Sequence, residues 1–205
     1  MFKGSSGSAG AWLALLSCYE QDTTIRVWDK QCGTLLRSLA GHRGPVNAVQ
    51  LLGDRVLSAS GDSIVKLWDV RTGECLRVYT GHERGLACVQ FAPSGRFFAT
   101  GSNDRKIKIW QTDTGDCLRT FEGHTDLVRS LAFKEETQKL VSGSYDKTIR
   151  VWDLETGEQL LKFPNAHSSL VFDVSFSVSR ILSSVCPPHK CGMFPLTLVP
   201  SQVQP

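Results

Sequence analysis

The sequence has no long hydrophobic run. Its longest nearly apolar run, Ala9 to Tyr19, has eleven residues, whereas a membrane-spanning helix needs about 20. Lys3 precedes this run, but no small-x-small cleavage site follows it, so we do not expect a secretory signal peptide. These absences exclude a helical membrane span and predict no membrane partner.

The sequence also lacks an excess of either charge and an even set of cysteines. It has 23 Lys and Arg against 20 Asp and Glu, a net charge of +3, which is too small to predict a nucleic-acid partner. Its seven cysteines are an odd number, and their positions follow a repeat rather than a disulfide framework. We therefore expect a reducing compartment, cytoplasmic or nuclear.

What the sequence does contain is an internal repeat. Four tryptophans set its period: Trp28, Trp68, Trp110 and Trp152 lie 40, 42 and 42 residues apart. Each has an Asp six residues before it and a Gly five residues after it. The Asp residues are Asp22, Asp62, Asp104 and Asp146, and Gly-His pairs recur at Gly41-His42, Gly81-His82 and Gly123-His124, with a degenerate Ala166-His167. Markers held in register over four periods predict a repeat architecture.

Within one period the local signals predict β-strands. Between Val128 and Pro164, the runs VRSLAF, KLVSGS, TIRVWDL and QLLKF are rich in β-branched and apolar residues and are separated by turn residues. Four short antiparallel strands would expose two hydrophobic faces if they stood alone. The sheets must therefore stack, and we expect an all-β radial or solenoidal array.

These residues resemble the WD-repeat (WD40) family of β-propellers. The resemblance covers about Trp12 to Ser184 and is carried by Gly-His pairs with Trp-Asp 26 to 28 residues further on. The stretches SGSYDKTIRVWDLETG and SASGDSIVKLWDVRTG match the family pattern almost throughout, while Trp110-Gln111 departs from the dipeptide. The resemblance implies a partial β-propeller of stacked four-stranded antiparallel blades.

The predicted division has three parts: a flexible Gly/Ser-rich start over 1–11, a WD-repeat segment over 12–184 and an irregular Pro-rich tail over 185–205. Within the segment we expect partial blades over 12–40 and 166–184 and complete blades over 41–80, 81–122 and 123–165. Propellers typically close with four to eight blades, and seven is usual in the family. We therefore expect an incomplete ring that self-associates through its open edges.

A Ser-His-Asp combination in these repeats is the residue set of a catalytic triad. An enzyme needs one such site, whereas this combination recurs in every complete repeat, so we predict no enzymatic activity. The resemblance implies instead a structural brace, in which the His, the Ser or Thr, the Asp and the Trp indole hydrogen-bond together. The predicted braces are His42, Ser58, Asp62 and Trp68; His82, Thr100, Asp104 and Trp110; and His124, Ser142, Asp146 and Trp152.

We predict no cofactor and no metal. The glycines after each Trp-Asp fit tight turns, and no Gly-Lys-Ser follows them to form a phosphate loop. Cys75 and Cys117 occupy the same repeat position and are predicted to be packing residues. The trio of Cys186, His189 and Cys191 has a metal-like spacing but lacks a fourth ligand.

Candidate protein-binding residues are those that differ between blades while the braces repeat. The resemblance implies that the loops before each inner strand and the turns before each brace Asp line one propeller face. The positions five after each His are Asn47, Ala87, Arg129 and Phe172, and those preceding each Asp are Gln21, Gly61, Asn103 and Tyr145. Of these we nominate Asn47, Asn103, Arg129, Tyr145 and Phe172 as protein-binding residues.

The predicted function is a non-catalytic scaffold that binds other proteins or peptides through its propeller face. One alternative is a fragment of a ubiquitin ligase substrate receptor. Arg129 and Tyr145 resemble the substrate face of F-box/WD-repeat proteins, where an Arg at this position binds phosphorylated peptide. Only one of the four equivalent positions is Arg, however, whereas a strong phosphate-binding site would cluster several.

Overall fold

The computed structural model of the chain describes residues 14–17, 23–29, 31–164, 166–176, 181–185 and 197–199. Regular structure in these ranges is β-strand, apart from one short 3-10 helix, η1 (Glu135–Thr137). No helix in the described ranges is long and apolar enough to cross a membrane. The structure confirms the predicted all-β fold class.

The described strands form antiparallel sheets in which sequence neighbours are also sheet neighbours. Three sheets have four strands each. These are β4 (Val46–Leu52), β5 (Arg55–Ser60), β6 (Val65–Asp69) and β7 (Cys75–Tyr79); β8 (Leu86–Phe91), β9 (Phe97–Ser102), β10 (Ile107–Gln111) and β11 (Cys117–Phe121); and β12 (Val128–Lys134), β13 (Lys139–Ser144), β14 (Ile149–Asp153) and β15 (Gln159–Phe163). We call these blades 2, 3 and 4.

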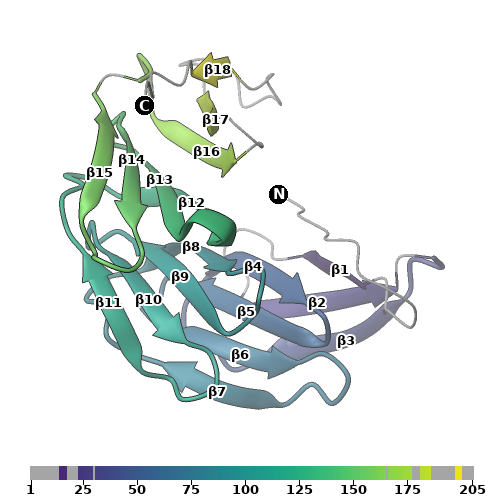
Figure 1. The fold of residues 1–205 in the computed structure, drawn as a ribbon. Coiled ribbons are helices and arrows are strands. Elements are labelled where there is room, and N and C mark those ends of the chain that lie inside the picture. Colours follow the sequence, from purple (N-terminus) through teal and green to yellow (C-terminus); the bar gives the residue numbers. More distant parts are fainter. Residues whose placement is uncertain are drawn as a thin grey trace.

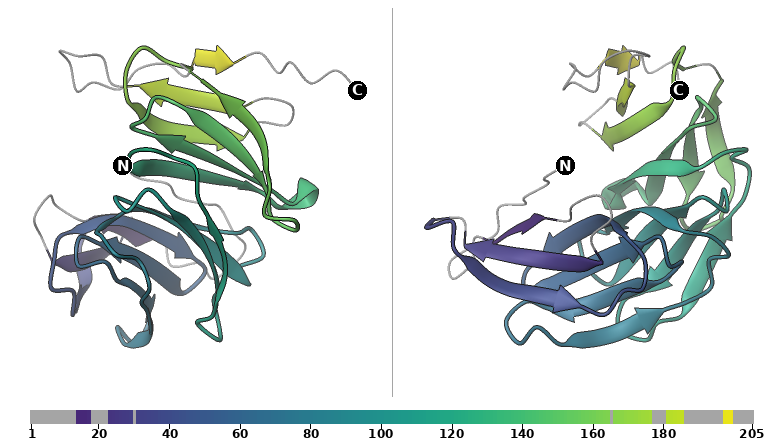
Figure 2. Two further views of the ribbon diagram at one scale, coloured as in Figure 1. Left: turned by 90° about the vertical axis from the view of Figure 1, so that its left-hand side faces the viewer. Right: turned by 180° about the vertical axis from the view of Figure 1, so that it is seen from behind.

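Two three-stranded sheets flank the complete blades. Blade 1 consists of β1 (Ala14–Ser17), β2 (Thr24–Asp29) and β3 (Leu35–Ala40), and blade 5 of β16 (Val171–Phe176), β17 (Ile181–Val185) and β18 (Thr197–Val199). The blades follow one another along an arc (Figure 1), and views from the side and from behind show the arc open between blades 1 and 5 (Figure 2). The described fold is a partial, open β-propeller, as predicted.

The hydrophobic core is divided among the junctions between blades. Leu57 and Tyr79 of blade 2, for example, share one buried cluster with Phe98 and Trp110 of blade 3. The rings of Tyr79 and Phe98 lie edge to face, with their centroids 4.8 Å apart. Similar clusters lie between the other neighbouring blades. Each blade is therefore stabilised chiefly by the blades beside it, as in other repeat architectures.

The C-terminal part of the chain differs from the predicted division. β17 extends to Val185. β18 lies within the segment 185–205, which the sequence predicts to be irregular, and it pairs with β17. A run of Thr, Leu and Val favours a strand, while Pro195 and Pro200 on either side limit its length. Blade 5 has three strands in the described residues. The predicted flexible start over 1–11 lies outside them.

Candidate functional site

Each complete blade contains the same buried hydrogen-bonded set. In blade 2, His42 Nδ1 lies 2.9 Å from Asp62 Oδ2 and His42 Nε2 lies 2.8 Å from Ser58 Oγ. The indole Nε1 of Trp68 donates to the same Ser58 oxygen at 2.9 Å. The corresponding distances are 2.6, 2.8 and 2.9 Å for His82, Thr100, Asp104 and Trp110, and 2.8, 2.7 and 2.8 Å for His124, Ser142, Asp146 and Trp152.

The brace Asp also ties two loops together. Asp62 Oδ2 accepts the backbone N–H of Arg43, which lies in the loop before β4, at 2.9 Å. Asp62 Oδ1 accepts the N–H of Ile64 in its own turn at 3.1 Å. The turn also requires a positive φ of 68° at Ser63, a conformation that needs such local support in a residue other than Gly. The brace therefore fixes the loops of one propeller face.

Burial and hydrogen bonding set the charges within the braces. Burial alone would raise the pKa of Asp104, but hydrogen bonds from His82 and from two backbone N–H groups lower this pKa to about 2. Desolvation lowers the pKa of His42 and of His124, although the neighbouring carboxylates oppose that shift. At neutral pH these two braces thus hold a neutral imidazole, which donates to the Asp and accepts from the Ser hydroxyl.

The braces are not accessible to a substrate. Ser58, Thr100 and Ser142, the hydroxyl residues in the position of a nucleophile, are each 0% exposed. Each hydroxyl oxygen is already bound by an imidazole and an indole. This arrangement satisfies buried polar groups rather than activating one of them.

Blade 5 contains part of a brace that the sequence analysis did not assign. His167 Nε2 lies 2.6 Å from Ser183 Oγ. The signal was present in the spacing, since Ser183 follows His167 by 16 residues, as Ser58 follows His42. In the sequence, Pro187 and Met193 stand where the repeat would place the Asp and the Trp.

Three of the candidate protein-binding residues come together at the junction of blades 4 and 5. The guanidinium carbon of Arg129 lies 5.9 Å from the centroid of the Phe172 ring. The rings of Phe172 and Tyr145 have their centroids 5.4 Å apart. All three side chains are half-buried, and Arg129 Nη1 donates to the carbonyl of Ala87 at 3.2 Å. We call these three residues the Arg129 cluster.

The other candidates are placed separately. Asn47 is exposed, and its side-chain amide donates to the carbonyl of Leu86 in blade 3 at 2.7 Å. Asn103 is exposed in the β9–β10 turn. The expectation that Ala87 lines the propeller face is wrong. Ala87 is only 7% exposed and lies on β8, which packs against both β4 and β12. Gln21 lies outside the described residues.

The cysteines require a further correction. Cys75 and Cys117 are exposed, so the prediction that they are packing residues is wrong. They lie on the outer strands β7 and β11, each at the edge of its sheet. In the described part of the chain, no group of three His, Cys, Asp or Glu side chains could hold a metal ion. The Cys186, His189 and Cys191 trio lies outside that part.

A second repeated contact, which the sequence analysis did not predict, joins the outer strand of one blade to a turn of the next. Arg37 donates to the carbonyls of Arg71 and Thr72, at 2.8 and 3.2 Å. Arg77 and Arg119 donate in the same way to the turns of blades 3 and 4. Each is the ninth residue after its Trp. We call these three residues the rim arginines.

Comparison with known proteins identifies the family. The sequence pattern described as WD domain, G-beta repeat matches residues 33–69, 73–111 and 115–153, which together make up more than half of the chain. The chain therefore belongs to the WD40 repeat family. No curated protein matches it. Residues 33–69 contain β3 of blade 1 as well as β4, β5 and β6 of blade 2, so each sequence repeat links two neighbouring blades.

Proposed function

We propose that this chain is a non-catalytic scaffold that binds proteins or peptides through the face formed by the brace loops. WD40 repeats imply a protein-interaction scaffold in general. The observation that carries the proposal for this face is the Arg129 cluster, in which one cation and two aromatic rings gather at a blade junction. Arg and Tyr are common among the residues that dominate protein-binding energies.

The braces support this function by holding the face rigid. Asp146 Oδ2 accepts the N–H of Thr125 in the loop before β12 at 3.1 Å, and its own turn carries Tyr145. The contact between Arg129 and Phe172 also restricts the guanidinium, and such cation–π contacts contribute about 0.5–1 kcal/mol at exposed sites. Side chains held in place before binding lose less conformational entropy when a partner arrives.

A second candidate function is the binding of a phosphorylated peptide, as in an F-box/WD-repeat receptor. Arg129 favours it, because a guanidinium can donate two parallel hydrogen bonds to a phosphate. Asn47, Ala87 and Phe172, at the equivalent positions, carry no charge. We therefore rank this function below general peptide binding.

Quantitative affinity capture from cell extract tests both candidates. We expect Arg129→Ala to lower the amount of its specific partners by about tenfold while lowering the melting temperature by no more than a few degrees. Arg96→Ala is the matched control, because Arg96 is an exposed cation on the opposite face, in the β8–β9 turn. Equal capture by wild type and Arg129→Ala would remove the cluster from the binding face. If phosphatase treatment of the extract abolishes capture, the phosphopeptide function is favoured.

A further inference from the structure

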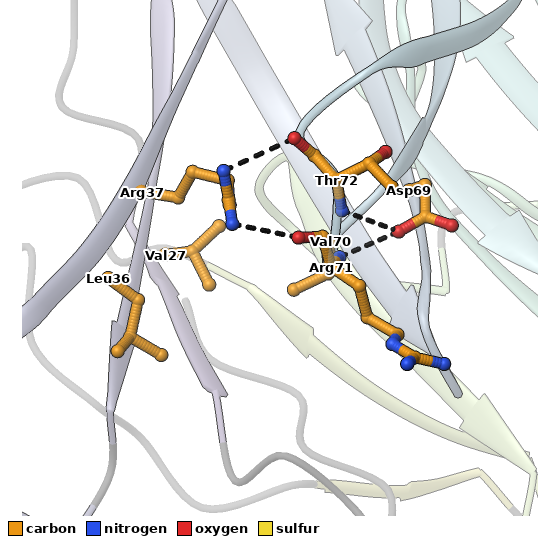
Figure 3. A pocket seen from close by; sticks show the side chains of 7 residues that line it. All are labelled: Val27, Leu36, Arg37, Asp69, Val70, Arg71 and Thr72. Atoms are coloured by element: carbon orange, nitrogen blue, oxygen red, sulfur yellow. Dashed lines mark hydrogen bonds between the residues drawn. The ribbon is translucent and has the colours of Figure 1, made fainter.

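A hollow of about 540 Å³ lies at the junction of blades 1 and 2. Its volume falls within the range of about 300–1,000 Å³ that is typical of ligand pockets. It opens beside β3 and the β6–β7 turn (Figure 3), at the strand ends opposite to the brace loops. The lining residues are Val27, Leu36, Arg37, Asp69, Val70, Arg71 and Thr72.

The hollow combines an apolar surface with a fixed cation. Leu36 is 42% exposed and supplies the accessible apolar surface, whereas Val27 and Val70 are 1% and 7% exposed and form a buried floor. The guanidinium of Arg37 reaches across the junction to the carbonyls of Arg71 and Thr72 (Figure 3). These bonds occupy two of the five N–H donors of an arginine, so the group can still bind an anion.

The other two junctions that carry a rim arginine show what is unusual about this one. The turn residue three positions after the Trp is acidic there, Asp113 in blade 3 and Glu155 in blade 4, but it is Arg71 in blade 2. Asp113 accepts a hydrogen bond from Arg55 at 2.8 Å. The first junction has therefore exchanged a negative for a positive side chain. Arg71 accepts a hydrogen bond from Arg37 through its backbone carbonyl, while its exposed side chain extends away from the Arg37 guanidinium (Figure 3).

The neighbouring positions also differ. At the second junction, the Tyr79 hydroxyl donates to the carbonyl of Thr112 at 2.6 Å. At the first junction these two positions hold Leu39 and Val70, and leucine has no hydroxyl to make the bond. The third junction likewise holds apolar residues there, Phe121 and Leu154. The hydroxyl contact is therefore peculiar to the second junction, and the first junction is distinguished by Arg71.

The acidic residues nearby do not cancel the two guanidinium groups. Asp69 Oδ1 accepts the backbone N–H groups of Arg71 and Thr72 at 2.7 and 3.0 Å, so it is engaged in its own turn. Arg71 Nη1 lies 3.8 Å from Asp54 Oδ2, with the two side chains 64% and 47% exposed. Exposed pairs of this kind contribute little and exchange readily with other partners.

We propose that this hollow binds a short segment of a partner protein in which an apolar side chain stands next to a carboxylate. The apolar side chain packs on Leu36 above the buried Val27 and Val70. The carboxylate accepts hydrogen bonds from the remaining donors of Arg37 and from Arg71, whose exposed side chain turns toward it. Such charge-assisted bonds are stronger than neutral ones. The site lies at a different junction from the Arg129 cluster and adds a second docking surface to the proposed scaffold.

Fluorescence anisotropy with the full chain tests this proposal. The probe is a labelled hexapeptide pool, Gly-Ser-Φ-Asp-Gly-Ser with capped ends, in which Φ is Leu, Ile, Val or Phe. A control pool carries Lys in place of Asp. We expect the acidic pool to bind about tenfold or more tightly than the Lys pool. Equal binding of the two pools, or no binding up to about 1 mM, would overturn the proposal.

The chain supplies its own matched variants. Arg71→Asp introduces the residue that the equivalent turn of blade 3 already holds as Asp113, so the fold should tolerate it. We expect Arg71→Asp to weaken binding by about tenfold and Arg71→Lys to keep most of it. Unchanged binding by Arg71→Asp would refute the assignment. Binding of octanoate at the same site without binding of the peptide would assign the hollow to small carboxylic acids and also refute it.

Two controls separate this site from other effects. Asp113→Asn alters the next junction without adding a cation and should leave peptide binding unchanged. Arg129→Ala should also bind the peptide as the wild type does. If Arg129→Ala abolishes peptide binding, the peptide occupies the brace-loop face and this proposal fails. If Arg129→Ala loses only the partners captured from extract, the two surfaces are independent.

Discussion

Blades 2 to 4 and the two flanking three-stranded sheets contain recognisable parts of the same repeat, yet their tryptophans differ in burial and their described braces differ in completeness. In the complete blades, Trp68, Trp110 and Trp152 are each 2% exposed and donate to a brace hydroxyl. Trp28 of blade 1 is only half-buried. In blade 5, the described brace consists of His167 and Ser183. We therefore expect a blade to be stabilised by cover on both sides and by a complete brace, rather than by the repeat pattern alone.

The largest expected difference concerns tryptophan. Trp110→Ala removes a buried indole that packs against Phe98 and Tyr79, and such a change costs about 3–5 kcal/mol of unfolding free energy. Trp28→Ala should cost clearly less, because Trp28 is half-buried. Urea unfolding followed by far-UV circular dichroism measures both. Similar losses for the two variants would mean that blade 1 is as well packed as blade 3.

The brace itself is tested next. Asp146→Ala leaves the buried donors of His124 and Thr148 without their acceptor, and we expect a loss of about 1–3 kcal/mol. His167→Ala removes a single partly buried bond and should cost about 0.5–1.5 kcal/mol. Thermal unfolding compares the two variants. An unchanged melting temperature for Asp146→Ala would contradict the structural role of the brace.

The smallest effect near neutral pH should come from titration. The pKa values of His42 and His124 are lowered in the folded chain, so the unfolded chain takes up protons first as the pH falls below about 6.5. The pKa of Asp104 is lowered to about 2, so protonation of this residue also favours the unfolded chain, at lower pH. Stability should therefore decline gently from about pH 7 to 5 and more steeply below about pH 4. A melting temperature that stays constant over this range would contradict the lowered pKa values of His42, His124 and Asp104.

The braces could be predicted from the sequence through the family resemblance, because the Asp and the Ser or Thr have fixed offsets from their Trp and the His precedes it by 26 or 28 residues. Asp104 stands six residues before Trp110 and Thr100 ten residues before it, and alternation along paired strands turns these offsets into contacts. The strands of the complete blades could be predicted because the same apolar runs and turn residues recur in each period. A periodic pattern thus determines both the sheet and the polar groups inside it.

Contacts between blades were harder to predict. Arg77 looks like an ordinary charged residue on an edge strand, and only the stacking of two sheets brings it to the carbonyl of Thr114. Ala87 was misplaced because its exposure depends on how β8 packs against β4 and β12. The hollow at the first junction also required the structure, since its lining comes from two blades.

The rim arginines give the arc a direction. Each reaches forward from its own outer strand to the following blade, while the corresponding position of blade 4 holds Leu161, whose side chain has no donor. In the described residues, the outer edge of the junction between blades 4 and 5 therefore lacks this arginine contact. Local opening in native-state hydrogen exchange should begin where blade 5 meets blade 4 and spread toward blade 1, with each guanidinium contact slowing the next step. Local unfolding would then proceed in order from the C-terminal blade rather than start at any blade.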